Sequence, residues 1–214
     1  MQSTLPTAGS HRKQAGQRGA SLIIVLIVLT IVSLLGVAGI QVSMMSERGA
    51  RNDRDMQLAW QSAESALIDA ELELFVVPTV GSASTRQDIL FDSLGKEKPK
   101  SLSYVDGCGT GTQVGLCNPI ATGKPVWLTV PFTLTGSAAQ SASYGQFTGR
   151  TFAAGTLGIQ PAAVPRYIVE LINVPGLGNR DQGNLESIPL YRVTAMGFGP
   201  RTDVQAVVQM IYRN

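Results

Sequence analysis

Few side chains in this sequence of 214 residues are suited to catalysis. The only histidine is His11, which precedes a long apolar run. Two carboxylate pairs, Asp53/Asp55 and Glu71/Glu73, have the residue types that general acid–base chemistry uses. Both pairs fall in a segment with helical periodicity, so we expect them on a solvated helix surface. Without a histidine after this run, Ser–His–Asp, Cys–His and histidine metal sites are excluded there, and we predict neither an enzyme nor a metal or cofactor site.

The two cysteines, Cys108 and Cys117, are separated by only eight residues. They follow the apolar run, and if that run leads to export they reach an oxidising compartment. There we expect one disulfide, which for so short a loop contributes roughly 2–3 kcal/mol of stability. The alternative is a metal site, but two thiols with no histidine nearby are a poor ligand set.

The apolar run is long enough to cross a membrane. No charged residue occurs from Gly19 to Ser46, and about 20 apolar residues span a bilayer as a helix. Three basic residues and no acidic one precede the run, which favours a cytoplasmic N-terminus and an exported remainder. A secretory signal peptide is disfavoured because the run is too long and lacks an A-x-A exit. The rest of the chain is close to neutral, so no nucleic-acid surface is expected.

The helical pattern continues after the membrane segment. Apolar residues at steps of three and four are expected on one helix face: Met56, Ala59, Trp60, Ala63, Ala66, Leu67, Ala70 and Leu74. Polar residues are expected elsewhere on the helix surface: Asp53, Asp55, Gln61, Glu64, Ser65, Asp69 and Glu71. No proline lies between Pro6 and Pro78, so one helix from about Ala20 to Phe75, roughly 80 Å long, is allowed. Two helices with a break near Gly49 are the alternative.

After Phe75 the sequence is rich in turn formers and has no helical period. Residues 136–149 are small and polar, and they indicate a long surface loop. Segments rich in β-branched and aromatic residues predict strands at 166–174, 188–199 and 202–213, with a fourth at 125–132. Residues 199–201 would form the turn of a C-terminal hairpin.

Two stretches carry a resemblance to a known family. "QRGASLIIVLIVLTIVSLLGVAGI", residues 17–40, resembles the start of type IV pilin-like proteins, whose precursors have a basic leader ending in glycine before an apolar helix. "RNDRDMQLAWQSAESALIDAE" (51–71) and "YRVTAMGFG" (191–199) narrow the resemblance to the PilX-type minor pilins. The family implies an α+β fold, in which a long N-terminal helix packs on a small antiparallel sheet.

The resemblance also implies processing. In that family a prepilin peptidase cuts after the leader glycine, here Gly19, and methylates the new N-terminus, here Ala20. The mature chain would then contain no histidine. The implied organisation is a cleaved leader (1–19), a transmembrane and filament-core helix (20–46), an amphipathic helix (47–75) and a periplasmic α+β head (76–214).

One position departs from the family pattern. Most pilins have glutamate at the fifth mature position, which is Ile24 when counted from Ala20. Leu22 and Ile23 match the usual apolar pair before it. Some minor pilins and the K-type pseudopilins of type II secretion also lack this acid. A subunit without it needs no neighbouring amine to neutralise a buried charge, which favours a position at or near the fibre tip. The alternative is that an apolar residue is simply tolerated at this position anywhere in the fibre.

The function that the resemblance implies is a minor pilin that primes type IV pilus assembly and joins the fibre, supporting adhesion and twitching motility. Its partners would be other minor pilins, the major pilin, the prepilin peptidase, a large tip adhesin and, before assembly, inner-membrane lipid. It would sit in the inner membrane and then in the extracellular pilus. The alternatives are a K-type-like tip pseudopilin of type II secretion, or an adhesive fibre module that binds through loops in residues 76–160.

Overall fold

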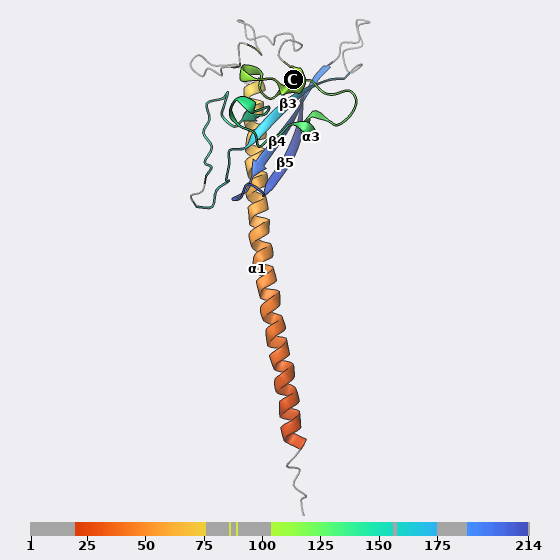
Figure 1. The fold of residues 1–214 in the computed structure, drawn as a ribbon, viewed down its shortest axis with the longest axis vertical. Coiled ribbons are helices and arrows are strands. Elements are labelled where there is room, and N and C mark those ends of the chain that lie inside the picture. The colour runs from red at the N-terminus through yellow and green to blue at the C-terminus, as the bar shows by residue number, and fades with distance from the viewer. Residues whose placement is uncertain are drawn as a thin grey trace, which may run out of the picture. The chain divides into compact units, whose positions relative to one another are not determined.

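The computed structural model describes residues 20–75, 86, 89, 104–155, 158–174 and 188–213 (Figure 1). The leader, with Gly19, lies outside the described residues. The chain divides into two units, Met1–Ala50 and Arg51–Asn214, and each is described by itself.

Helix α1 runs from Ala20 to Phe75 as one element. The single-helix prediction is confirmed, and the alternative of a break near Gly49 is wrong. An α-helix satisfies its backbone N–H and C=O groups internally, which is what an apolar environment requires of the first half. Two hydroxyls within this half follow the same rule, since Thr30 donates to the carbonyl of Ile27 and Ser33 to that of Leu29, both at 2.7 Å.

The second unit contains a small mixed sheet. Its strands are β1 (Leu116–Cys117), β2 (Ala142–Ser143), β3 (Arg166–Val174), β4 (Ile188–Phe198) and β5 (Gln205–Arg213). The order is β1-β3-β4-β5, with β2 also paired to β3. The β3–β4, β4–β5 and β2–β3 pairs are antiparallel, whereas β1 runs parallel to β3. The predicted α+β class is confirmed, although the sheet is not purely antiparallel.

Three of the four predicted strands are present. β3 has the predicted bounds, and β4 ends one residue before the predicted limit. β5 begins at Gln205 instead of 202 because the hairpin turn is longer than predicted. In this turn the amide of Gly199 donates to the carbonyl of Val204 at 2.8 Å, and that of Val204 donates to the carbonyl of Arg201 at 3.1 Å.

The strand predicted at 125–132 is wrong. Residues Val126–Thr129 form the short helix α3, which follows Pro125 in an extended conformation. The amide of Val130 closes the turn by donating to the carbonyl of Val126 at 3.0 Å. This turn buries Val126 beside the cysteines and Ile168, a packing interaction that the local sequence pattern does not reveal.

Both faces of β3 are buried. Tyr167, Val169 and Leu171 face the same core as the alanine-rich side of α1. Ile168, on the opposite face, packs with the cysteines, Val126 and Phe132. Figure 1 shows strands β3, β4 and β5 beside the second half of α1. The sheet is therefore held between this helix and the chain around the cysteines.

The buried face of α1 differs in part from the predicted one. Six of the eight predicted apolar residues are buried, but Met56 and Trp60 are 44% and 50% exposed. Trp60 lies about 100° around the helix from Ala59 and so points away from the sheet. Conversely, Asp69 and Glu73, predicted on the surface, are 0% and 1% exposed. They follow Ala66 and Ala70 by three residues and lie at the margin of the same buried face.

Candidate functional site

Strand β4 and helix α1 are in backbone contact at a glycine. A Cβ atom on Gly197 would lie 2.2 Å from both the carbonyl oxygen of Ala59 and the amide nitrogen of Ala63. No side chain fits there, and the alanines keep the helix surface low enough for the strand to approach. The two stretches that carry the family resemblance after the apolar run, 51–71 and 191–199, thus meet at this contact.

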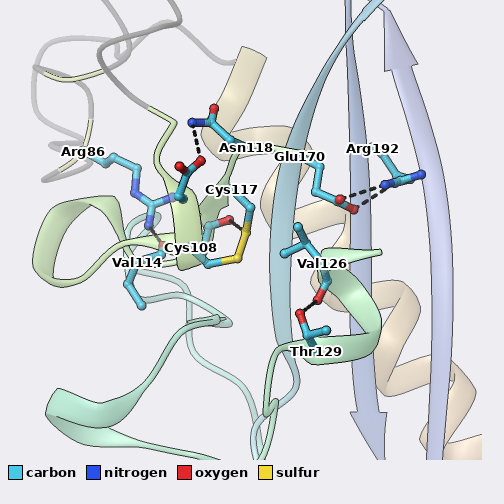
Figure 2. Close-up of a disulfide and its surroundings, with 11 residues drawn as sticks. Arg86, Cys108, Val114, Cys117, Asn118, Val126, Thr129, Glu170 and Arg192 are labelled. Carbon is cyan, nitrogen blue, oxygen red and sulfur yellow. Dashed lines mark hydrogen bonds and ion pairs between the residues drawn. A yellow bond between two sulfur atoms is a disulfide. The ribbon is translucent and has the colours of Figure 1, made fainter. Parts of the chain in front are cut away.

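A buried ion pair ties α1 to two other parts of the second unit. Glu73 Oε1 lies 2.7 Å from Arg86 Nη1, with both side chains fully buried. The hydroxyl of Tyr167, on β3, donates to Glu73 Oε2. Arg86 Nη2 donates to the carbonyl of Val114 (Figure 2), and its guanidinium lies 3.5 Å from the ring centroid of Phe147. One helix carboxylate therefore connects the helix, the sheet and the chain near the cysteines.

Burial shifts the pKa of two groups in this cluster, Glu73 and Tyr167. Loss of solvent raises the pKa of the Glu73 carboxyl above its ordinary value, while Arg86 and the Tyr167 hydroxyl oppose that rise. Burial, together with the carboxylate beside it, also raises the pKa of Tyr167 well above its ordinary value. Tyr167 is consequently a neutral hydrogen-bond donor. The geometry makes this a structural anchor, because every charged group in it is engaged within the protein.

One turn earlier, Asp69 anchors a second segment to α1. Its carboxylate accepts hydrogen bonds from the amide of Gly145 at 2.7 Å and the hydroxyl of Thr148 at 2.5 Å. Arg150 Nη1 lies 3.7 Å away. Residues 136–149 are therefore only in part the surface loop that was predicted, since they include β2 and the buried Phe147.

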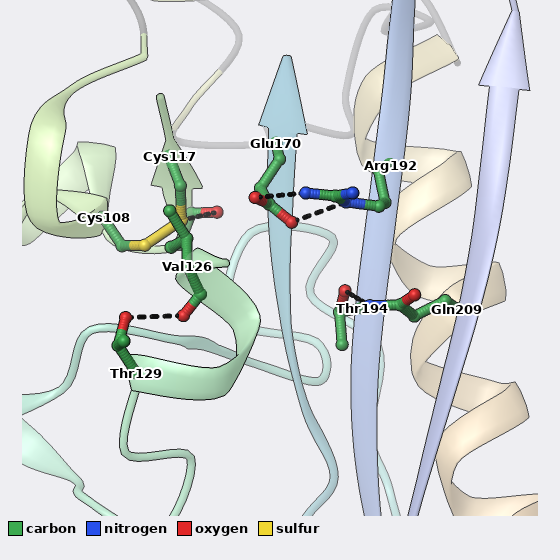
Figure 3. A network of polar contacts seen from close by, with 9 residues as sticks. Cys108, Cys117, Val126, Thr129, Glu170, Arg192, Thr194 and Gln209 are labelled. Carbon is green, nitrogen blue, oxygen red and sulfur yellow. Dashed lines mark hydrogen bonds and ion pairs between the residues drawn. A yellow bond between two sulfur atoms is a disulfide. The ribbon is translucent and has the colours of Figure 1, made fainter. Parts of the chain in front are cut away.

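Cys108 and Cys117 form a buried disulfide with an S–S distance of 2.05 Å (Figure 2). Cys117 belongs to β1 and pairs with Glu170 of β3. Glu170 in turn accepts two hydrogen bonds from Arg192 of β4, at 2.8 and 2.7 Å (Figure 3). The disulfide thus fastens the loop between the cysteines to the sheet, on the face of β3 that points away from α1.

The first half of α1 has a continuous apolar surface. Ile24, the position where most pilins have glutamate, is 61% exposed, and the large aliphatic side chains from Leu22 to Met45 are exposed with it. Within the described residues, α1 is the one helix long and apolar enough to cross a membrane. Ala20 is the first residue of this helix. Ile24 belongs to the first unit of the chain, and the two cysteines belong to the second.

The carboxylate pairs do not form a shared acid–base site. Glu73 is buried in its ion pair, whereas Glu71 is exposed. Asp55 forms a hydrogen bond with Arg54 at 3.1 Å, and Asp53 is exposed. In the part of the chain that the structure describes, no group of three or more histidine, cysteine or acidic residues could hold a metal.

Sequence reasoning missed the anchoring residues Asp69, Glu73, Arg86 and Gly197. The spacing of four between the two acids, beside alanines with the same spacing, is a signal that could have indicated Asp69 and Glu73. Gly197 lies inside an otherwise apolar strand, a position where glycine often marks close backbone approach. No feature of the sequence around Arg86 indicates its burial.

An uncovered apolar helix that continues into an amphipathic half, with a small disulfide-fastened sheet packed on that half, defines a type IV pilin-like subunit. The family model described as PilX N-terminal matches residues 18–67, and that of the type IV pilus assembly protein PilX C-terminal region matches residues 113–214. The two matches together cover more than two thirds of the chain. The chain therefore belongs to the PilX family of type IV pilus minor pilins. No match is found among curated proteins or among solved structures.

Proposed function

We propose that this minor pilin primes pilus assembly and is built into the fibre at or near its tip, where it supports adhesion and twitching motility. The observation that carries the proposal is the uncovered apolar surface of α1 from Leu22 to Met45 in a chain of this family. Burying one large aliphatic side chain contributes about 1.5–3 kcal/mol, so this surface is strongly disfavoured in water. Lipid covers this apolar surface before assembly, and the helices of other subunits cover it afterwards.

Processing is part of this proposal. Gly19 has no side chain to obstruct a peptidase at the membrane edge, and Ala20 directly follows it in the sequence. We expect the mature protein to begin at Ala20, and Gly19→Val to leave an unprocessed precursor. Mass spectrometry of protein from piliated cells tests this expectation. Residues 1–19 still attached in the wild-type protein would contradict it.

Ile24 supports the tip position. A glutamate within a membrane helix is costly unless it is paired, and in most pilins the amine of an adjacent subunit can neutralise the glutamate at this position. With Ile24 this chain needs no such amine, whereas its own amine at Ala20 can receive the glutamate of the next subunit. A subunit with this asymmetry can start a fibre to which others are added.

The second half of α1 also presents a surface suited to neighbouring subunits. Met56, Trp60, Ile68 and Leu72 are exposed apolar residues whose spacing is a multiple of four. Residues spaced by four form the ridges through which helices commonly pack. We infer that other minor pilins and the major pilin contact this ridge, in which Glu64 is the charged residue and accepts a hydrogen bond from Trp60.

Labelling the head on isolated pili tests the proposal. We expect the label at one end of the fibre. Ile24→Glu should allow the subunit into the shaft and spread the label, while the matched control Ile24→Leu should keep it at the end. Even labelling of wild-type shafts would remove the tip position, and unlabelled pili would remove incorporation itself.

Deletion of the gene separates the candidate functions. Loss of surface pili and twitching supports the priming role. Loss of exported enzymes with normal pili would instead indicate a type II pseudopilin. Loss of adhesion with a normal number of pili would indicate an adhesive module.

A further inference from the structure

The head contains a cavity whose wall includes a buried arginine. The cavity has a volume of about 760 Å³ and lies between residues 132–135, residues 163–166 and the turn that joins β4 to β5. Phe132, Val164 and Phe198 form apolar parts of its wall. Pockets of roughly 300–1,000 Å³ with apolar walls and a few polar groups are typical of small-molecule sites.

Arg166, the first residue of β3, is the basic residue in the lining of this cavity. Arg166 as a whole residue is only 7% exposed. Nε donates to the hydroxyl of Ser141 at 2.9 Å, and Nη2 donates to the carbonyl of the same residue. Both acceptors are neutral, and no carboxylate among the described residues forms an ion pair with Arg166. A guanidinium has five N–H donors, so donors remain for a ligand.

The surroundings do not compensate this charge. Burial lowers the pKa of the Arg166 guanidinium below its ordinary value. Asp203 is the acidic residue in the lining, but it is exposed and accepts a hydrogen bond from Arg201 Nε at 2.9 Å. A buried cation is costly unless an anion accompanies it. Arg166 differs in this respect from Arg86 and Arg192, whose partners are Glu73 and Glu170.

We propose that this cavity binds a small organic acid with a compact apolar body. The carboxylate pairs with the guanidinium of Arg166, which matches carboxylate geometry and can hold it with two parallel hydrogen bonds. The apolar body packs on Phe132 and Phe198, and Thr133 and Thr135 of the same lining carry hydroxyls that can accept or donate further hydrogen bonds. This binding goes beyond the proposed assembly function, which requires no ligand.

Fluorine NMR on the full chain in detergent micelles tests the proposal, with ring-fluorinated phenylpropionate as the probe. The matched neutral probe is the corresponding amide, and empty micelles give the background. We expect saturable binding of the acid, and binding of the amide weaker by about tenfold or more, because a hydrogen bond to a charged group is lost. No saturable binding above the micelle background, or equal binding of acid and amide, would overturn the proposal.

Three variants locate the site. Arg166→Gln should remove the preference for the acid over the amide, and Ala163→Trp should block both probes by filling the cavity. Arg213→Gln removes an exposed arginine outside the lining and should bind as the wild type does. If Arg166→Gln does not fold, the acid–amide preference of the wild type and its loss in Ala163→Trp decide the question. An acid preference that survives Ala163→Trp or a folded Arg166→Gln would place binding elsewhere and overturn the proposal.

Discussion

The two halves of helix α1 share one backbone conformation but have opposite surroundings. From Leu22 to Met45 the large aliphatic side chains are exposed, and the hydroxyls of Thr30 and Ser33 bond to carbonyls of the helix itself. From Ala59 to Leu74 one face is buried, and it combines four alanines with a serine, two leucines and two buried carboxylates. Bulky residues present a surface for lipid or other helices, whereas small residues let the chain's own sheet approach to backbone contact. The chain covers one face of the second half itself and leaves the first half exposed, which is the half that the proposed function assigns to lipid and to other subunits.

The largest effect is expected at the anchor of the covered half. Glu73→Gln removes the charge that neutralises the buried guanidinium of Arg86. Breaking a buried ion pair in this way costs about 3–5 kcal/mol. Glu64→Gln is the matched control, because Glu64 is exposed on the same helix and only accepts a hydrogen bond from Trp60. Thermal unfolding of the full chain in detergent, followed by near-UV circular dichroism, measures both. Equal unfolding temperatures for the two variants would contradict the role of Glu73.

The glycine contact should be nearly as sensitive. Gly197→Ala places a Cβ 2.2 Å from backbone atoms of Ala59 and Ala63, which cannot move without bending the helix or shifting β4. We expect a loss of about 3 kcal/mol from overpacking. Gly36→Ala in the uncovered half meets no atom within 4 Å and should leave the unfolding temperature of the head unchanged. If Gly197→Ala is as stable as Gly36→Ala, the helix and the sheet are not in backbone contact.

The elements found from the sequence are those with a long periodic signal. Helix α1 follows from apolar spacing and the lack of proline, and β3, β4 and β5 follow from runs of β-branched and aromatic residues. β1 and β2 have two residues each, too few for any periodicity to show. The segment 125–132 has strand-like composition, but packing of Val126 beside the disulfide selects a helical turn.

The anchoring site was beyond local sequence reasoning for a different reason. An acid in an amphipathic helix is usually solvated, and the burial of Asp69 and Glu73 depends on partners far along the chain. Asp69 is bound by Gly145 and Thr148, and Glu73 by Arg86 and Tyr167. The helical pattern gives their positions around the helix but not the segments that cover them.

Loss of the disulfide should have a smaller effect on stability, and this effect should be confined to the head. Cys108→Ser frees the loop that the bond fastens to the sheet. We expect the head to lose about 2–3 kcal/mol of stability, while membrane insertion of the first half is unchanged. Thermal unfolding with and without reductant measures the first effect, and extraction of the protein from membranes measures the second. Ready labelling of both cysteines in the native protein without reductant would show that the bond is absent.

The smallest effect on stability is expected in the uncovered half of α1. The same substitution, leucine to alanine, can be made in both halves and compares them directly. Leu34 is 71% exposed and Leu74 is 3% exposed on the same helix. Leu74→Ala should destabilise the head by about 2–5 kcal/mol, because it leaves a cavity in the core, whereas Leu34→Ala should change it by no more than about 0.5 kcal/mol. Denaturant unfolding in one detergent compares them directly. Leu34→Ala should instead reduce the amount of this subunit recovered in sheared pili, because in the fibre the Leu34 side chain would contact neighbouring helices. A head destabilised equally by both substitutions would mean that the first half contributes to the chain's own core and is not reserved for assembly.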